Sequence, residues 1–131
     1  GSTLLAIDVN NNGVMDLILG DVSYPNITLL MNGGTAPNTN SVMISQDHDY
    51  PSATHPVSMQ QFPAMYWEDV DFDGKKDLIV APNARTVSEN QQSVHFFKNT
   101  GTNALPTFAF QENNFLQKVS NACSCFYLER F

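Results

Sequence analysis

Basic residues are scarce in this sequence. Lysine and arginine together number 6 among 131 residues, against 13 aspartates and glutamates, so the formal net charge is −7. Nucleic acids and anionic membranes bind through basic patches, so we expect neither as a partner, and the acidic excess favours cations as ligands. No apolar run approaches the roughly 18 residues that cross a bilayer, so we predict no membrane span.

Cysteine is almost absent as well, since only Cys123 and Cys125 are present. Their spacing is awkward for a disulfide within the pair, and zinc would need about four ligands, so free thiols are the simpler interpretation. The segment 119–131 around them fits no pattern and is left unassigned. The chain contains no Gly-x-Ser-x-Gly nucleophile elbow and no phosphate loop, so we predict no enzymatic activity. It opens with Gly1-Ser2, so we expect any signal peptide to be missing from this sequence.

Aspartate, by contrast, is concentrated in two short windows among asparagine and glycine. Six of the nine aspartates fall within residues 8–16 and 69–77. The windows belong to an internal repeat, which is carried by two pairs of matching segments: 6–20 with 67–81 at an offset of 61 residues, and 29–34 with 96–101 at an offset of 67. We therefore predict two repeats, 1–63 and 64–118, with a long loop region at 35–63.

Four short segments in each repeat are rich in β-branched and aromatic residues and are separated by turn residues, which is typical of strands. They are 3–7, 16–20, 27–31 and, more weakly, 42–45 in the first repeat, and 64–68, 77–81, 93–98 and 107–111 in the second. The apolar runs at 17–19 and 78–80 do not alternate, which indicates strands buried on both faces. No segment has a helical period. The sequence predicts an all-β protein, with four strands per repeat as in β-propeller blades or a related repeat.

Both aspartate windows follow the pattern Asp-x-[Asp/Asn]-x-[Asp/Asn]-Gly-x-x-Asp. Ca²⁺ prefers six to eight oxygen ligands, and a curled loop can bring alternate side chains and one backbone carbonyl to the same point. The glycine permits the sharp turn. The candidate ligands are Asp8, Asn10, Asn12, the Val14 carbonyl and Asp16 in the first loop, and Asp69, Asp71, Asp73, the Lys75 carbonyl and Asp77 in the second. The sequence thus predicts up to two Ca²⁺ ions.

Two other structures could account for the same loops, an EF-hand and a plain turn. An EF-hand would need a bidentate glutamate at the twelfth loop position, where the chain has Leu19 and Val80, so an EF-hand is rejected. Aspartate, asparagine and glycine also form plain turns without metal. Four carboxylates in the second loop would repel one another without a cation, which favours metal there. The first loop has two carboxylates and two amides, so its occupancy stays open.

The two loops, the strands Asp-Leu-Ile-Leu-Gly and Asp-Leu-Ile-Val-Ala that follow them, and the later turns Asn-Gly-Gly and Asn-Thr-Gly resemble FG-GAP/VCBS repeats. The resemblance covers about residues 3–112. It implies a β-propeller-type fragment with two four-stranded blades, each with a calcium loop between its first two strands, as in integrin α-subunits and many secreted bacterial proteins. The chain departs from the family in having two repeats rather than seven, and in Asn10 and Asn12 where aspartate is commoner.

The same resemblance carries the expected function. It implies a calcium-binding module of a secreted or cell-surface protein that presents a surface to a protein or glycan partner, as in adhesion. The alternatives are an accessory module of a larger secreted enzyme acting on polysaccharide, or a structural spacer. Two blades would leave apolar faces and strand edges uncovered, so we expect self-association or a place within a larger propeller.

Overall fold

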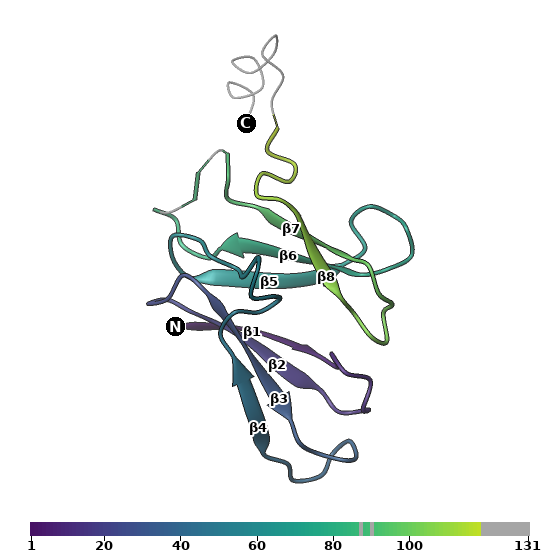
Figure 1. Ribbon diagram of the computed structural model, residues 1–131. Coiled ribbons are helices and arrows are strands. Elements are labelled where there is room, and N and C mark those ends of the chain that lie inside the picture. The colour runs from purple at the N-terminus through teal and green to yellow at the C-terminus, as the bar shows by residue number, and fades with distance from the viewer. Residues whose placement is uncertain (87, 90, 119–131) are drawn as a thin grey trace.

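The computed structural model describes residues 1–86, 88–89 and 91–118. These residues form eight β-strands and no helix, arranged as two antiparallel four-stranded sheets (Figure 1). The first sheet contains β1 (Ser2–Ile7), β2 (Asp16–Asp21), β3 (Ile27–Asn32) and β4 (Met43–Asp47), and the second contains β5 (Pro63–Glu68), β6 (Asp77–Pro82), β7 (His95–Asn99) and β8 (Phe108–Glu112). Each sheet follows chain order and stays open, with two edges. The all-β prediction is confirmed.

All eight predicted strands are present, with ends that move by one or two residues. The weakly predicted strand at 42–45 is β4, and β7 begins two residues later than expected. One sheet lies in each predicted repeat, and β5 begins at Pro63, the last residue assigned to the first repeat. The segment 119–131, with both cysteines, lies outside the described residues.

The two repeats build their first hairpin in the same register. Ala6 pairs with Leu17 in the first sheet, and Trp67 pairs with Leu78, their equivalents at the offset of 61, in the second. In both hairpins an aspartate is the first residue of the second strand, directly after the carboxylate loop. The loop therefore joins equivalent strand ends in both repeats, as the sequence predicted.

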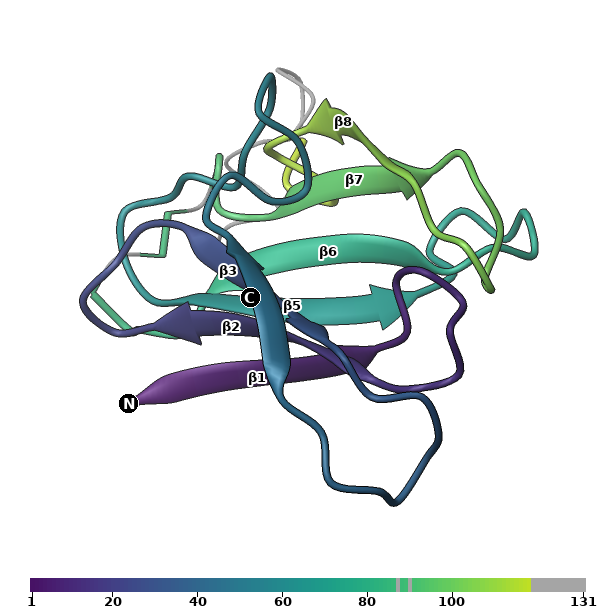
Figure 2. The same ribbon diagram turned by 60° about the horizontal axis from the view of Figure 1, so that its bottom comes forward.

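The sheets lie closest together where β1 and β2 meet β5 (Figures 1 and 2). A side-chain Cβ on Gly20 would come within 2.0 Å of the Pro63 carbonyl oxygen, so only glycine permits this approach. The Thr3 hydroxyl donates a hydrogen bond of 2.5 Å to the same carbonyl. Ile18 and Phe97 are almost without exposed surface in the core between the sheets.

The loop region 35–63 contributes more than a connection with one strand. After β4, the chain passes between the two sheets, where they splay apart (Figure 1). Tyr50 and Val57 from this segment are buried in the core, and the Tyr50 ring meets Phe108 edge-on at 6.3 Å. Burial, and then the negative charges of Asp16 and Asp47, raise the pKa of the Tyr50 hydroxyl above its usual range.

The expectation that both apolar runs are buried on two faces is only partly met. Leu78 and Val80 in β6 are fully buried, and Ile79 between them is half-buried. In β2, by contrast, burial alternates, so Ile18 is buried while Leu17 and Leu19 are half-exposed. The physical reason is that, among the described residues, no second layer covers that side of β2.

Candidate metal centre

A buried aspartate anchors each carboxylate loop to its sheet. Asp77 has no exposed surface, and its two carboxylate oxygens accept hydrogen bonds from the amides of Asn99 (2.8 Å) and Val70 (3.3 Å). Asp16 repeats this arrangement in the first sheet, where the amides of Asn32 (2.7 Å) and Val9 (3.0 Å) donate to it. Each loop is thereby tied to its own start and to the end of the third strand.

The second loop curls around the carboxylate of Asp69. One Asp69 oxygen accepts a hydrogen bond from the Asp73 amide (3.2 Å), and the other accepts one from the Gly74 amide (2.9 Å). Phe72 (φ 61°) and Gly74 (φ 89°) both adopt the left-handed conformation. A bulky residue rarely adopts it, and Phe72 is 91% exposed, so its own packing does not explain it. The bonds to Asp69 hold the turn in place.

This curl brings three of the predicted ligands together. Asp69, Asp71 and Asp77 each offer a carboxylate oxygen, and these three oxygens lie within 4.8 Å of one another. Such a group could hold a metal ion, since carboxylate oxygens suit hard cations such as Ca²⁺ and Mg²⁺. Burial decreases from Asp77, which is fully buried, through Asp69 to the exposed Asp71, so the group opens toward solvent.

Two of the predicted ligands in this loop lie outside the three-aspartate group. The Asp73 carboxylate accepts hydrogen bonds from the Lys75 amide (2.9 Å) and from the Lys98 ammonium (2.8 Å). Lys75 is half-buried, and it contacts the loop through its backbone amide, which donates to Asp73, rather than through its carbonyl. The structure therefore supports Asp69, Asp71 and Asp77 more directly than it supports Asp73 and Lys75.

Lys98, on β7, is a residue of the site that the sequence analysis missed. Its ammonium pairs with the carboxylates of Asp71 and Asp73. The hydrogen bonds to Asp71 and then Asp73 raise the pKa of Lys98, and the hydrogen bond from Lys98, followed by that from the Lys75 amide, lowers the pKa of Asp73. The repeat offset of 67 aligns Lys98 with Met31 of the first repeat, and this change from an apolar to a charged residue was the one indication in the sequence.

The first loop has the same backbone arrangement with fewer charges. Asp8 accepts hydrogen bonds from the amides of Asn12 (3.2 Å) and Gly13 (2.9 Å), as Asp69 does from their equivalents. The side-chain oxygens of Asn10 and Asn12 accept bonds within the loop, the latter from the Val14 amide at 3.0 Å. Val14 has a buried side chain. The loop thus presents Asp8 and the buried Asp16 as carboxylates and two amides as neutral oxygen donors.

An asparagine at the end of the third strand supports each loop; Asn99 is fully buried and Asn32 is half-buried. The Asn99 side chain donates to the carbonyls of Lys76 (3.0 Å) and Thr102 (3.0 Å) and accepts from the amides of Gly101 (2.9 Å) and Thr107 (3.1 Å). Asn32 makes two of these four contacts, with Met15 and Gly34. The sequence marked both asparagines as turn residues but did not indicate that they brace the loops.

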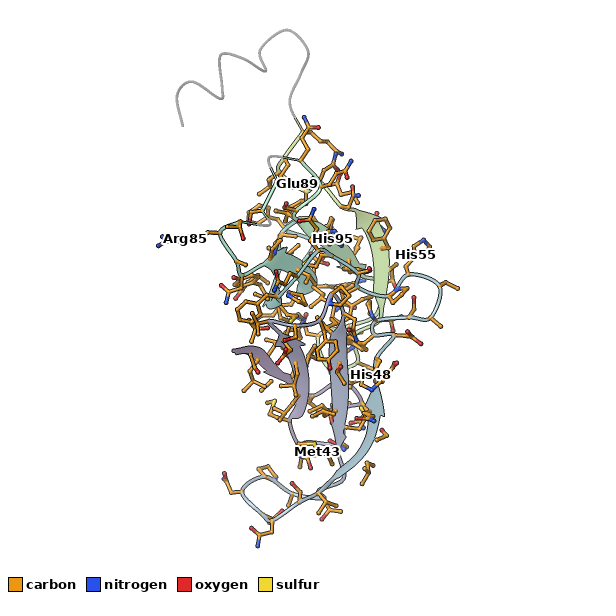
Figure 3. The ribbon with its side chains drawn as sticks, turned by 90° about the vertical axis from the view of Figure 1, so that its left-hand side faces the viewer. Met43, His48, His55, Arg85, Glu89 and His95 are labelled. Atoms are coloured by element: carbon orange, nitrogen blue, oxygen red, sulfur yellow. The ribbon has the colours of Figure 1, made fainter. Side chains whose placement is uncertain are left out.

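The three histidines do not come together (Figure 3), and none belongs to the three-aspartate group. His48 shares a hydrogen bond of 2.9 Å with Thr28, and the His55 ring stacks on Phe110 at 5.3 Å. His95 lines a hollow of about 210 Å³ together with Glu89 and Ser93. The Ser93 hydroxyl accepts a hydrogen bond of 2.6 Å from the Glu89 amide, and Ser93 makes no hydrogen bond to His95.

Comparison with models of protein families, with curated proteins and with solved structures finds no match to this chain. The resemblance to FG-GAP/VCBS repeats therefore rests on the loop, strand and turn residues of this sequence alone. In the part of the chain that the structure describes, no helix has the length and apolar character needed to cross a membrane.

Proposed function

We propose that this chain is a calcium-binding β-repeat module of the propeller-blade type, belonging to a secreted or cell-surface protein. The observation that carries the proposal is the convergence of Asp69, Asp71 and Asp77 within 4.8 Å. The resemblance to FG-GAP/VCBS repeats supports the blade type, the location and a role in presenting a surface to a protein or glycan partner. No catalytic role is part of the proposal.

The donor set fits Ca²⁺ better than a softer metal. All candidate side-chain ligands offer oxygen, and zinc or copper sites usually include histidine or cysteine. A bound Ca²⁺ would add two positive charges among carboxylates that otherwise repel one another. Asp77 would link the ion to the buried end of β6, whereas Asp69 and Asp71 would link it to the loop. Calcium would in this way fasten the loop to the sheet.

The second loop is proposed to bind before the first. It carries four carboxylates against two, and affinity rises with ligand charge in sites of similar rigidity. Lys98 reduces this difference in affinity, because its ammonium is paired with the carboxylates of Asp71 and Asp73. Extracellular calcium modules commonly bind with dissociation constants of about 10⁻⁴–10⁻³ M, and we expect the second loop in this range.

The decisive experiment is a calorimetric calcium titration together with thermal unfolding in calcium and in EDTA. Binding to the folded chain alone would raise the free energy of unfolding by about 1.4 kcal/mol at ten times the dissociation constant. Asp71→Asn keeps the oxygen that accepts the Asp73 amide and removes one charge, so it should weaken calcium binding by about tenfold without unfolding the loop. Asp49→Asn, at an exposed aspartate outside both loops, is the matched control and should bind normally.

A variant that should strengthen calcium binding tests the same proposal. Asn10 is the first-loop equivalent of Asp71, so Asn10→Asp should strengthen calcium binding by the first loop. If neither heat of binding nor a shift in unfolding temperature accompanies calcium, and Asn10→Asp changes nothing, the calcium proposal is wrong. Magnesium serves as a comparison ion, because its smaller octahedral shell suits a flexible loop less well.

A further inference from the structure

The first sheet carries an apolar face that nothing covers among the described residues. We call it the open face, and it is formed by side chains that point away from the second sheet: Leu4, Ala6, Leu17, Leu19 and Leu30. Leu4 is 62% exposed and Tyr24, at its margin, is 61% exposed. A hollow of about 510 Å³, lined in part by Leu19, Leu30 and Tyr24, indents this face. Contiguous apolar surface of this kind commonly marks an interaction site.

The equivalent face of the second repeat is buried inside the protein. At the two repeat offsets, the open-face residues correspond to Met65, Trp67, Leu78, Val80 and Phe97. These five side chains point toward the first sheet and belong to the core or pack against it. Leu17 is half-exposed, whereas its equivalent, Leu78, has no exposed surface. Equivalent residues of the two repeats are therefore exposed in the first sheet and buried in the second.

The surface that covers them is the other face of the first sheet, which includes Leu5, Ile18 and Leu29. The second repeat has equivalents of this face too, and they lie on its outward side: Tyr66, Ile79 and Phe96. The interface inside the chain thus joins two different faces of a repeated unit, which makes it heterologous, or head-to-tail. A heterologous contact leaves one unused face of each type, here one on each sheet.

The outward face of the second sheet has the character that such a contact needs. Tyr66 is 53% exposed, and Ile79 is half-buried beside it in the sheet. Phe96 is covered by Phe115, whose ring lies 4.9 Å away, so the apolar strip continues across β7. Glu68 is the equivalent of Ile7 in the first sheet. Because Glu68 is charged, the apolar strip ends there and is confined to the part of the face around Tyr66.

We propose that the open face docks the outward face of the second sheet of another copy of this chain, head to tail. The argument is continuity with the interface already present between the two sheets, since the docking faces are the repeat equivalents of faces that pack there. The proposal rests on the packing faces of the two sheets and does not depend on calcium binding. Such contacts close into a ring or extend into a chain of copies.

Sedimentation velocity at increasing protein concentration tests the proposal with one charged variant in each face. Leu4→Glu places a charge in the open face, and Tyr66→Glu places one in the outward face of the second sheet. Both positions are exposed in the single chain, so both variants should fold, which cooperative thermal unfolding verifies. Leu105→Glu, at a loop residue that is 53% exposed like Tyr66, is the matched control and should associate as the unchanged chain does.

Mixing separates a head-to-tail contact from a symmetric one. Each face variant alone should stay monomeric, but an equimolar mixture should form one-to-one dimers, because each variant keeps the face that the other has lost. The proposal is overturned if the unchanged chain is monomeric at every concentration. It is also overturned if the mixture stays monomeric, or if Leu4→Glu abolishes association while Tyr66→Glu associates as the unchanged chain does, since both results indicate a contact of the open face with itself or elsewhere.

Discussion

Asp77 accepts a hydrogen bond of 2.8 Å from the backbone amide of Asn99, and neither residue has any exposed surface. Asp16 and Asn32 form the same bond in the first repeat, at 2.7 Å. In both repeats this bond ties the end of the carboxylate loop to the end of the third strand. The loop therefore has a fixed attachment in the sheet, and its carboxylates are positioned by the protein itself.

Asn99→Ala should cost more stability than Asn32→Ala. Asn99 is fully buried and makes four side-chain hydrogen bonds, so its loss leaves several backbone groups without a partner. We expect a loss of about 2–3 kcal/mol in the free energy of unfolding for Asn99→Ala and about 1 kcal/mol for Asn32→Ala, which has two such bonds. Urea unfolding of both variants measures the difference, and equal losses would contradict the assignment.

Lys98→Met should increase the calcium affinity of the second loop by roughly three- to tenfold. The substitution copies Met31 of the first repeat and removes the ammonium that competes with a cation for Asp71 and Asp73. Calorimetric titration measures the change. Lys118→Met removes another paired lysine, whose partner is Glu112, and should leave the affinity unchanged. A weaker affinity in Lys98→Met would show that Lys98 supports the site instead.

Gly20→Ala should destabilise the contact between the sheets by about 1–3 kcal/mol, because the new methyl group would meet the Pro63 carbonyl at 2.0 Å. Gly13→Ala provides a contrast. Its methyl group would enter open space, and its cost of about 1–2 kcal/mol would come from the left-handed backbone alone. Fluorescence of Trp67, the single tryptophan and a neighbour of the core, should shift in Gly20→Ala and stay unchanged in Gly13→Ala.

His95 should make the protein less stable at mildly acidic pH. Burial lowers the pKa of His95 below its usual value of 6.5, against a smaller opposing effect of a hydrogen bond at the Gln92 backbone. The unfolded chain then binds the proton more readily, so stability is complete above that usual value and is lost as the pH falls toward the folded-state pKa. His95→Thr, which copies Thr28 of the first repeat, should lose less stability than the unchanged chain between about pH 7.5 and pH 5.

The matched control for this pH effect is His55→Thr, at an exposed histidine that stacks on Phe110. Its stability should follow the same pH course as that of the unchanged chain. Urea unfolding at the two pH values gives the loss of stability for each of the three proteins. Equal losses in all three would contradict the role of His95.

Local features of the sequence were sufficient to predict the strands and the two loops. Glycine in a left-handed turn and aspartates that accept nearby amides act within a few residues, so the pattern alone indicated where each loop curls. The constant offset of 61 residues is matched in the structure by a common hairpin register. Asp69, Asp71 and Asp77 could be named as candidate ligands on this basis, and the structure brings their carboxylates together.

Contacts between distant segments lay beyond the sequence pattern. Lys98 reaches Asp71 and Asp73 across 25 residues or more, and the repeat offset, which aligns Lys98 with Met31, marks the change of residue but not its partners. Tyr50 and Val57 stand in a polar stretch, and they enter the core only because the sheets splay apart and leave space for them.

The sequence by itself determined where the eight strands lie and that the second strand of each repeat is apolar on both faces. Only the tertiary structure decided which of those faces is covered. Leu17 and Leu78 occupy the same place in their repeats, yet Leu17 is half-exposed and Leu78 has no exposed surface. The physical reason is that the sheets pack through unlike faces, so equivalent residues meet a partner sheet in one repeat and solvent in the other.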